Sequence, residues 1–134
     1  MKESNPQYFK LTKSENEIME LMWKEGHPLS RSEIIELTPE RSWKSSSIHI
    51  LLNSMLDKRA IEVAGFVQST KNYARTFTPC ISSDHYAVMQ IKNSTVFSQN
   101  SVPNVVSALV EDVTTPSILD QLEEIVKTRR QELS

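Results

Sequence analysis

Glycine is scarce in this chain, with two glycines among 134 residues. A fold with many tight β-turns needs glycine at positions of positive φ, so the scarcity disfavours a β-rich fold and favours helices. Cysteine is scarcer still, and the single Cys80 excludes an internal disulfide and a cysteine cluster for zinc or copper. His27, His49 and His85 are scattered without metal-ligand spacing, and no glycine-rich phosphate loop is present. The sequence therefore predicts no metal and no cofactor.

Long apolar runs are also absent. No stretch approaches the ~20 apolar residues that a membrane-spanning helix needs, and the opening MKESNPQYFK lacks the apolar segment of a signal peptide. We therefore expect a cytoplasmic protein that is not inserted in a membrane. The sequence shows little sign of a catalytic site. Ser45, Ser46 and Ser47 lie near His49, but no carboxylate is spaced to orient that histidine. The expectation is that the protein is not an enzyme.

Acidic side chains are missing from residues 41–56, RSWKSSSIHILLNSML, although the net charge of the chain is −2. Residues 41–75 carry six basic and two acidic side chains, a net charge of +4, between flanks 1–40 and 76–134 of net charge −3 each. A basic island between acidic flanks is the distribution that contact with nucleic-acid phosphates requires. The alternative is an ordinary fluctuation of charge along a solvated chain.

Helix signals dominate the first part of the chain. The stretch LTKSENEIMELMWKEG has a capping box, Thr12 with Glu15, and an apolar face at helical spacing, so it predicts a helix over 13–25. The stretch HPLSRSEIIELTP repeats this device with Ser30 and predicts a short second helix. Pro39 stops that helix, because its ring clashes with the preceding turn and it has no amide donor.

A β-hairpin is expected farther along the chain. Residues 61–66 and 73–78 each alternate between two faces, with Val63 and Gly65 on one face and Phe66 on the other. The residues between them have the composition of a turn. Three helices followed by such a hairpin, within about 80 residues, are the layout of a winged helix-turn-helix.

The third predicted helix, over 45–59, has two different faces. At 100° per residue, five aliphatic residues beginning with Ile48 gather within about 80° and form the core face. The opposite face carries short polar groups and one isoleucine. A helix in the major groove places such residues against bases and phosphates, where carboxylates would be repelled. The residues expected to contact DNA, from this helix, the segment before it and the hairpin, are Arg41, Lys44, Ser45, Ser46, Ser47, His49, Ile50, Asn53, Lys71 and Arg75.

Each of these residues has an expected role and a simpler alternative. Asn53 suits a bidentate hydrogen bond to adenine, and Ile50 suits contact with a thymine methyl group. The serines and the basic side chains suit phosphate oxygens. In the simpler reading, Ser45 only caps the helix, His49 is a plain surface residue and Lys71 only solubilises the hairpin tip.

The pattern changes after the hairpin to three amphipathic helices. Their apolar stripes, sharpest in SVPNVVSALVEDV, are too small to bury one another, so we expect a second chain to cover them. The predicted fold is therefore mainly α within the α+β class, with a winged-helix DNA-binding domain over 10–80 and a helical dimerisation domain over 81–134. The residues expected in the dimer interface are Tyr86, Met89, Val105, Val106, Leu109, Ile118, Leu122, Ile125 and Val126.

Three stretches together resemble one family, the BlaI/MecI-type penicillinase repressors. LTKSENEIMELMW is similar to the family's opening helix, with its apolar-apolar-x-x-Trp block. SSSIHILLNSMLDKRAIE is similar to the recognition helix, and ARTFTPCISSDHY to the second wing strand and the entry to the dimerisation helices. The order and spacing of the three stretches carry the resemblance, which covers about residues 10–131.

The resemblance implies a bacterial homodimeric repressor that binds palindromic operators of genes for β-lactam resistance or, in a related branch, copper handling. In the β-lactam systems a membrane sensor-protease signals, and the repressor is cut in its C-terminal domain, which here corresponds to Ala108–Leu109. The chain departs from the pattern in places. The family often has a basic residue where His49 stands, threonines near Ile50 and Asn53, and, in the copper branch, a C-terminal cysteine cluster that this chain lacks.

Two rival interpretations remain open at this stage. A winged helix can serve only as a protein-interaction module, with the basic island bridging to an acidic partner. It can also belong to a regulator that senses a small ligand in an apolar pocket. The sequence does not exclude either.

Overall fold

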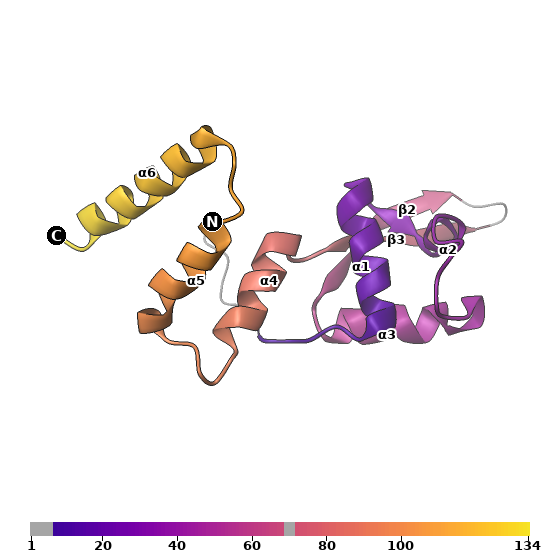
Figure 1. Ribbon diagram of the computed structural model, residues 1–134. Helices are drawn as coiled ribbons and strands as arrows, with labels where there is room; N and C mark the ends of the chain where they lie inside the picture. Colours follow the sequence, from indigo (N-terminus) through magenta and orange to yellow (C-terminus); the bar gives the residue numbers. More distant parts are fainter. Residues whose placement is uncertain (1–6, 69–71) are drawn as a thin grey trace. The chain divides into compact units, whose positions relative to one another are not determined.

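The computed structural model describes residues 7–68 and 72–134 (Figure 1). The chain divides into two compact units between Asn93 and Ser94. A boundary after residue 80 was expected from the sequence, so the first unit contains one more helix than expected. That helix, α4 (Ser83–Lys92), follows the hairpin directly.

Helix α1 spans Lys13–Glu25, as the sequence predicted. The Thr12 hydroxyl accepts from the Glu15 amide at 3.2 Å, and the Glu15 carboxylate accepts from the Thr12 amide at 2.8 Å. These two bonds satisfy backbone donors that the first helical turn leaves unpaired. The helix ends at Gly26, whose φ of 73° is the left-handed conformation that suits glycine.

Helix α2 spans Arg31–Glu36, and the predicted capping box between Ser30 and Glu33 is present. A short strand that the sequence analysis did not predict, β1 (Leu29–Ser30), precedes it. Two residues are too few to show an alternating pattern. The strand forms only because it pairs with the second hairpin strand, with Leu29 opposite Phe77.

The third predicted helix divides into two segments. Ser45–Ser47 form a 3₁₀ turn, η1, and the α-helix α3 begins at Ile48 and ends at Asp57. Arg59 follows with a φ of 64°, a left-handed conformation that stops the helix before its predicted end. The predicted core face is confirmed, since Ile48, Leu52 and Met55 are buried.

The hairpin consists of β2 (Ile61–Gln68) and β3 (Tyr73–Pro79), and the antiparallel sheet has the order β1-β3-β2. The predicted alternation along the first strand is wrong at one point. The register shifts between Val63 and Gly65, so that Val63 opposite Phe77 and Phe66 opposite Arg75 share one face of the sheet. The extra residue of this β-bulge reverses which face each later side chain takes.

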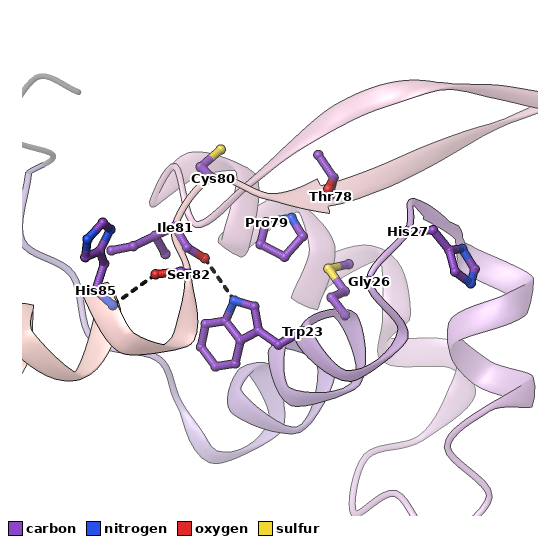
Figure 2. Close-up of a pocket in the computed structure, with 10 residues that line it drawn as sticks. Trp23, Gly26, His27, Thr78, Pro79, Cys80, Ile81, Ser82 and His85 are labelled. Carbon is purple, nitrogen blue, oxygen red and sulfur yellow. Dashed lines mark hydrogen bonds between the residues drawn. The ribbon is translucent and has the colours of Figure 1, made fainter. Parts of the chain in front are cut away.

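A single hydrophobic core holds α1, α2, α3 and the sheet together, with Ile18, Met19, Leu29, Ile34 and Met55 fully buried. Helix α4 joins this core through Tyr86. The Tyr86 hydroxyl accepts from the Leu11 amide at 2.9 Å, and its ring lies 5.7 Å from Phe9 and 6.1 Å from Trp23, centre to centre. The Trp23 indole donates a hydrogen bond to the Ile81 carbonyl at 2.9 Å (Figure 2). This bond joins α1 to the segment between β3 and α4.

The second unit contains η2 (Gln99–Ser101), α5 (Val102–Val110) and α6 (Pro116–Glu132). None of residues 94–134, all of which the structure describes, is buried. Leu109 is 64% exposed, Ile125 63% and Val126 58%. The helices that the sequence predicted are therefore present, but their apolar stripes stay open to solvent within one chain.

The first unit contains a buried carboxylate that bonds two of its elements, α1 and the segment after α3. Glu15 is 1% exposed, and its carboxylate accepts a hydrogen bond from the Lys58 ammonium just beyond α3. Lys58 also donates to the Lys10 carbonyl at 3.0 Å. Burial raises the pKa of Glu15, but hydrogen bonds from Lys58, from Ser54 and from the Thr12 backbone outweigh burial and hold the pKa below its ordinary value.

We expect Glu15→Gln to lower the free energy of unfolding at pH 7 by about 1.5–3 kcal/mol, because a charge-assisted bond becomes a neutral one. A carboxyl whose folded pKa is depressed contributes its full stability above its ordinary pKa of about 4.3 and loses it as the pH falls through the lower folded value. Urea unfolding of both proteins should therefore show a difference that shrinks below about pH 4. Glu20→Gln, at an exposed position of α1, is the control. A constant difference down to about pH 2.5 would contradict the assignment.

Candidate nucleic-acid interface

A groove of about 380 Å³ lies between the start of α2, the outer face of α3 and strand β3. We call it the helix–wing groove. Its floor is apolar, with Leu52 and Phe77 each 3% exposed. Ten residues line it: Arg31, Ser32, His49, Leu52, Asn53, Asn72, Tyr73, Ala74, Arg75 and Phe77.

The residues that line this groove include positive charges and no negative charge. Its ionisable lining residues are Arg31, His49, Tyr73 and Arg75, and none of the ten lining residues is a carboxylate. The Arg75 guanidinium lies over the Phe77 ring, 5.3 Å from its centre, which holds the cation at the groove wall. A concave surface with cations, amides and hydroxyls at its rim attracts anions and offers donors for base edges.

The groove brings together three residues that the sequence analysis selected: His49, Asn53 and Arg75. Lys44, Ser45, Ser46 and Ile50 are exposed on or before the same helix, and Ser47 is half-buried. Ile50 is 72% exposed, as its position opposite the core face predicts. Lys71 lies outside the described residues.

Arg41, which the sequence predicts to contact DNA, has partners within the loop before α3. Its guanidinium donates to the carbonyls of Ile35 at 3.2 Å and Thr38 at 3.1 Å, and it donates to the Ser45 hydroxyl. It also lies over the Trp43 ring, 5.1 Å from the centre. These contacts close the loop between α2 and α3, so the Arg41 guanidinium is held by the fold just before α3.

Two expected interface residues of α4 also have partners inside the first unit. Tyr86 carries the contacts described above, and Met89 packs against the same core. Both side chains are half-buried against the first unit in the single chain. The dimer surface proposed below therefore rests on the seven expected residues of α5 and α6.

Four polar residues of the groove were not among the predicted contacts: Arg31, Ser32, Asn72 and Tyr73. Arg31 and Ser32 open a helix that looked purely structural, and nothing local shows which element they face. Their position follows from the β1–β3 pairing, which brings the start of α2 to the wing. The exposed rings of Phe66 and Tyr73, at 66% and 71%, extend the wing beyond Arg75.

A second hollow, of about 390 Å³, lies in the first unit beside Trp23, Cys80 and His85 (Figure 2). Figure 2 shows His27 and His85 at opposite sides of this hollow, so the two histidines do not converge. Among the residues that the structure describes, no three His, Cys, Asp or Glu side chains are grouped to hold a metal ion.

A family model described as penicillinase repressor matches residues 11–128. The chain belongs to the penicillinase repressor family. It is therefore a winged-helix transcriptional repressor and not an enzyme. In the described part of this repressor, the helices are all too short or too polar to span a membrane.

The solved structures that this repressor is similar to match it at low sequence identity. No curated protein matches it. Bacillus subtilis PadR in complex with operator DNA is 19% identical over 89% of this chain and 70% of its own, with a TM-score of 0.47. Adhesin competence repressor from Streptococcus pyogenes is 12% identical over 93% and 84%, with a TM-score of 0.42. A mutant MepR from a multidrug resistant clinical isolate of S. aureus is 10% identical over 92% and 80%, with a TM-score of 0.44.

The contacts of Arg41 generate a stability prediction. Arg41→Ala removes two hydrogen bonds to backbone carbonyls, so it should lower the free energy of unfolding by about 1–3 kcal/mol in urea. Lys44→Ala, at an exposed position three residues later, removes the same charge and should change stability by no more than about 0.5 kcal/mol. Equal stabilities of the two variants would show that the Arg41 contacts do not hold the loop.

Proposed function

We propose that the protein is a homodimeric repressor of a bacterial resistance-type operon, with β-lactam resistance as the regulated function. It acts in the cytoplasm on a palindromic operator. The observation that carries the proposal is the helix–wing groove, where the outer face of α3 and the wing meet without a carboxylate. Membership of the penicillinase repressor family supports the choice of operon.

In this proposal α3 enters the major groove and the wing contacts the flanking backbone. Asn53 makes a bidentate hydrogen bond to adenine, and Ile50 touches a thymine methyl group. Lys44 and Arg75 neutralise phosphates, and the hydroxyls of residues 45–47 contact phosphate oxygens. His49, on the same outer face, contacts a base edge. Lys71, outside the described residues, keeps its proposed role at the wing tip.

The second unit supplies the dimer contact. Most of its aliphatic side chains are exposed in the single chain, and burial in a two-fold interface would remove them from water. The residues proposed for this contact are Val105, Val106, Leu109, Ile118, Leu122, Ile125 and Val126.

Relief of repression is proposed to occur by proteolysis within α5, at Ala108–Leu109. Both residues are exposed in the single chain. A cut there divides the apolar stripe of α5, so that it no longer packs as one unit. A sensor-protease is the proposed partner for this step, since the family resemblance implies one.

Base reading generates one prediction. Asn53→Ala should weaken binding to an operator duplex by about 1–3 kcal/mol and leave binding to random duplex almost unchanged. The operator is first selected from a random-sequence pool with the full-length protein, and affinities are measured by fluorescence anisotropy over a range of salt. Asn93→Ala, an exposed amide at the end of α4, is the matched control.

Two results would count against this assignment. Equal losses on operator and random duplex would remove Asn53 from the base-reading residues. A protein-interaction module would be favoured if the wild-type protein does not bind duplex DNA, or binds it with an affinity that does not depend on salt. Phosphate binding releases counterions and therefore weakens steeply with salt.

Assembly generates a second prediction. Leu122→Asp with Ile125→Asp should give monomers at micromolar concentration in sedimentation velocity, because each unpaired charge costs several kcal/mol when buried in the interface. Lys127→Asp changes the net charge by the same −2 on the opposite face of α6 and should leave the dimer intact. A double variant that remains dimeric would place the interface elsewhere.

The same interface can be broken by cutting the chain. A specific protease site inserted in α5 allows complete cleavage of the purified dimer. Operator affinity should then fall toward the non-specific range of about 10⁻⁴–10⁻⁶ M, because each freed winged domain binds a half-site alone. Undiminished affinity after complete cleavage would separate repression from this segment.

A further inference from the structure

The wing carries two aromatic rings that the fold leaves in solvent. Phe66 of β2 is 66% exposed and Tyr73 of β3 is 71% exposed. Other rings of the first unit, such as Phe9 and Phe77, lie in the hydrophobic core. One exposed ring is ordinary on a protein surface, whereas a group of large exposed apolar side chains marks a contact surface. Whether these two rings form a group depends on the pairing of the strands.

The strand register places both rings on one face of the hairpin. Phe66 lies opposite Arg75, and Gln68 lies opposite Tyr73. Side chains two residues apart on a strand point to the same face, so Tyr73 and Arg75 share a face and Phe66 joins them there. Tyr73 is thus the diagonal neighbour of Phe66, a separation that aromatic rings can span. We call Phe66, Tyr73 and Arg75 the aromatic wing face.

The aromatic wing face continues the helix–wing groove. Tyr73 and Arg75 line that groove together with Phe77, whose buried ring has the Arg75 guanidinium over it, 5.3 Å from its centre. The outer face of α3 lines the same groove through Asn53. A duplex that α3 reads in the major groove would therefore meet the aromatic wing face at the adjacent minor groove.

The charge of the wing fits a polyanion. Arg75 stands beside the two rings, and Glu62 is the only carboxylate among residues 61–79. Glu62 pairs with Thr78, the residue next to Phe77, so it points to the opposite face of the sheet. Two apolar rings with a cation and no carboxylate suit the minor groove, where apolar side chains contact base steps and a cation contacts phosphate.

We propose that Phe66 and Tyr73 form an apolar wedge that enters the minor groove beside each half-site and bends the operator. This inference rests on the proposed function. Apolar side chains inserted at a base step unstack it partly and kink the duplex, by about 20–90° in proteins that use this device. Pyrimidine–purine steps unstack most easily, so the wedge selects TA or CA/TG steps at positions outside the reach of α3. The wing thereby adds sequence selection through the deformability of DNA.

Parallel selections from one random-sequence pool test the wedge. The full-length wild-type protein should enrich pyrimidine–purine steps outside both half-sites. Phe66→Ala with Tyr73→Ala should select the same half-sites without that enrichment, and it should bind the wild-type operator about fivefold or more weaker. Phe66→Leu with Tyr73→Phe keeps two apolar side chains and should keep the enrichment. The matched control is Val67→Ala, which shortens an exposed apolar side chain on the opposite face of β2.

Bending is measured directly on the selected operator, at protein concentrations that saturate the duplex. Dyes at the two ends report the end-to-end distance by energy transfer, and 2-aminopurine at the flanking step brightens when that step unstacks. The wild-type protein and Val67→Ala should give both signals. Phe66→Ala with Tyr73→Ala should lose the 2-aminopurine signal and most of the energy transfer. A merely structural role of the rings would lower the affinity but leave the bend at saturation unchanged.

The outcomes separate this inference from the proposed function. If the wild-type protein selects a palindrome, and the double alanine variant selects the same flanks and bends the duplex equally, the wedge is refuted while the proposed function stands. The exposed rings would then belong to a contact with another protein or with a second copy of this chain. If the wild-type protein selects no sequence and binds no duplex, the proposed function fails and the wedge fails with it.

Discussion

Burial of one side of α3 is the constraint on which the rest of the interface depends. Ile48, Leu52 and Met55 pack into the core, and this packing sets the rotation of the helix about its axis. Asn53 and His49 then face outward because no other orientation keeps the aliphatic residues from water. The same rotation is held at the far end by Lys58, which is hydrogen-bonded to the buried Glu15 of α1. A helix free to roll would present its serines, its amide and its histidine in no fixed direction.

The short pairing between β1 and β3 converts that helix face into a groove. Leu29 opposite Phe77 fixes the start of α2 beside the wing, and α2 contributes Arg31 and Ser32 to the surface. Three elements that are separate in the chain, α2, α3 and β3, thus line one groove. The bulge after Val63 adds to this arrangement, because it turns Phe66 to the face that carries Arg75. Loop closure by Arg41 keeps the segment before α3 in place, with one side chain bonded to Ile35, Thr38 and Ser45.

The two units differ in how complete they are. The first has a closed core that includes α4 through Tyr86, whereas the second has helices without a buried residue among 94–134. Two helices of this length expose more apolar surface than they cover, since a small unit has little interior. In the proposed function this incompleteness is the means of control. If the core of the second unit is completed only by a second chain, a single cut within α5 is enough to disrupt it.

Much of the fold was predictable from local signals. The capping boxes at Thr12 and Ser30, the apolar period of α3 and the hairpin composition are all short-range, and short-range physics decides them. The outward position of Ile50 and Asn53 followed from the same period. The likeness of three stretches to penicillinase repressors is likewise present in the residues themselves, and the family match confirms it. Tertiary structure alone decided three other features: β1 exists only through its partner strand, Tyr86 turns inward to the rings of Phe9 and Trp23, and Arg31 meets His49 across 18 residues. Contacts of that kind leave no periodic signal, because the partners are set by how the elements pack and not by their spacing in the chain.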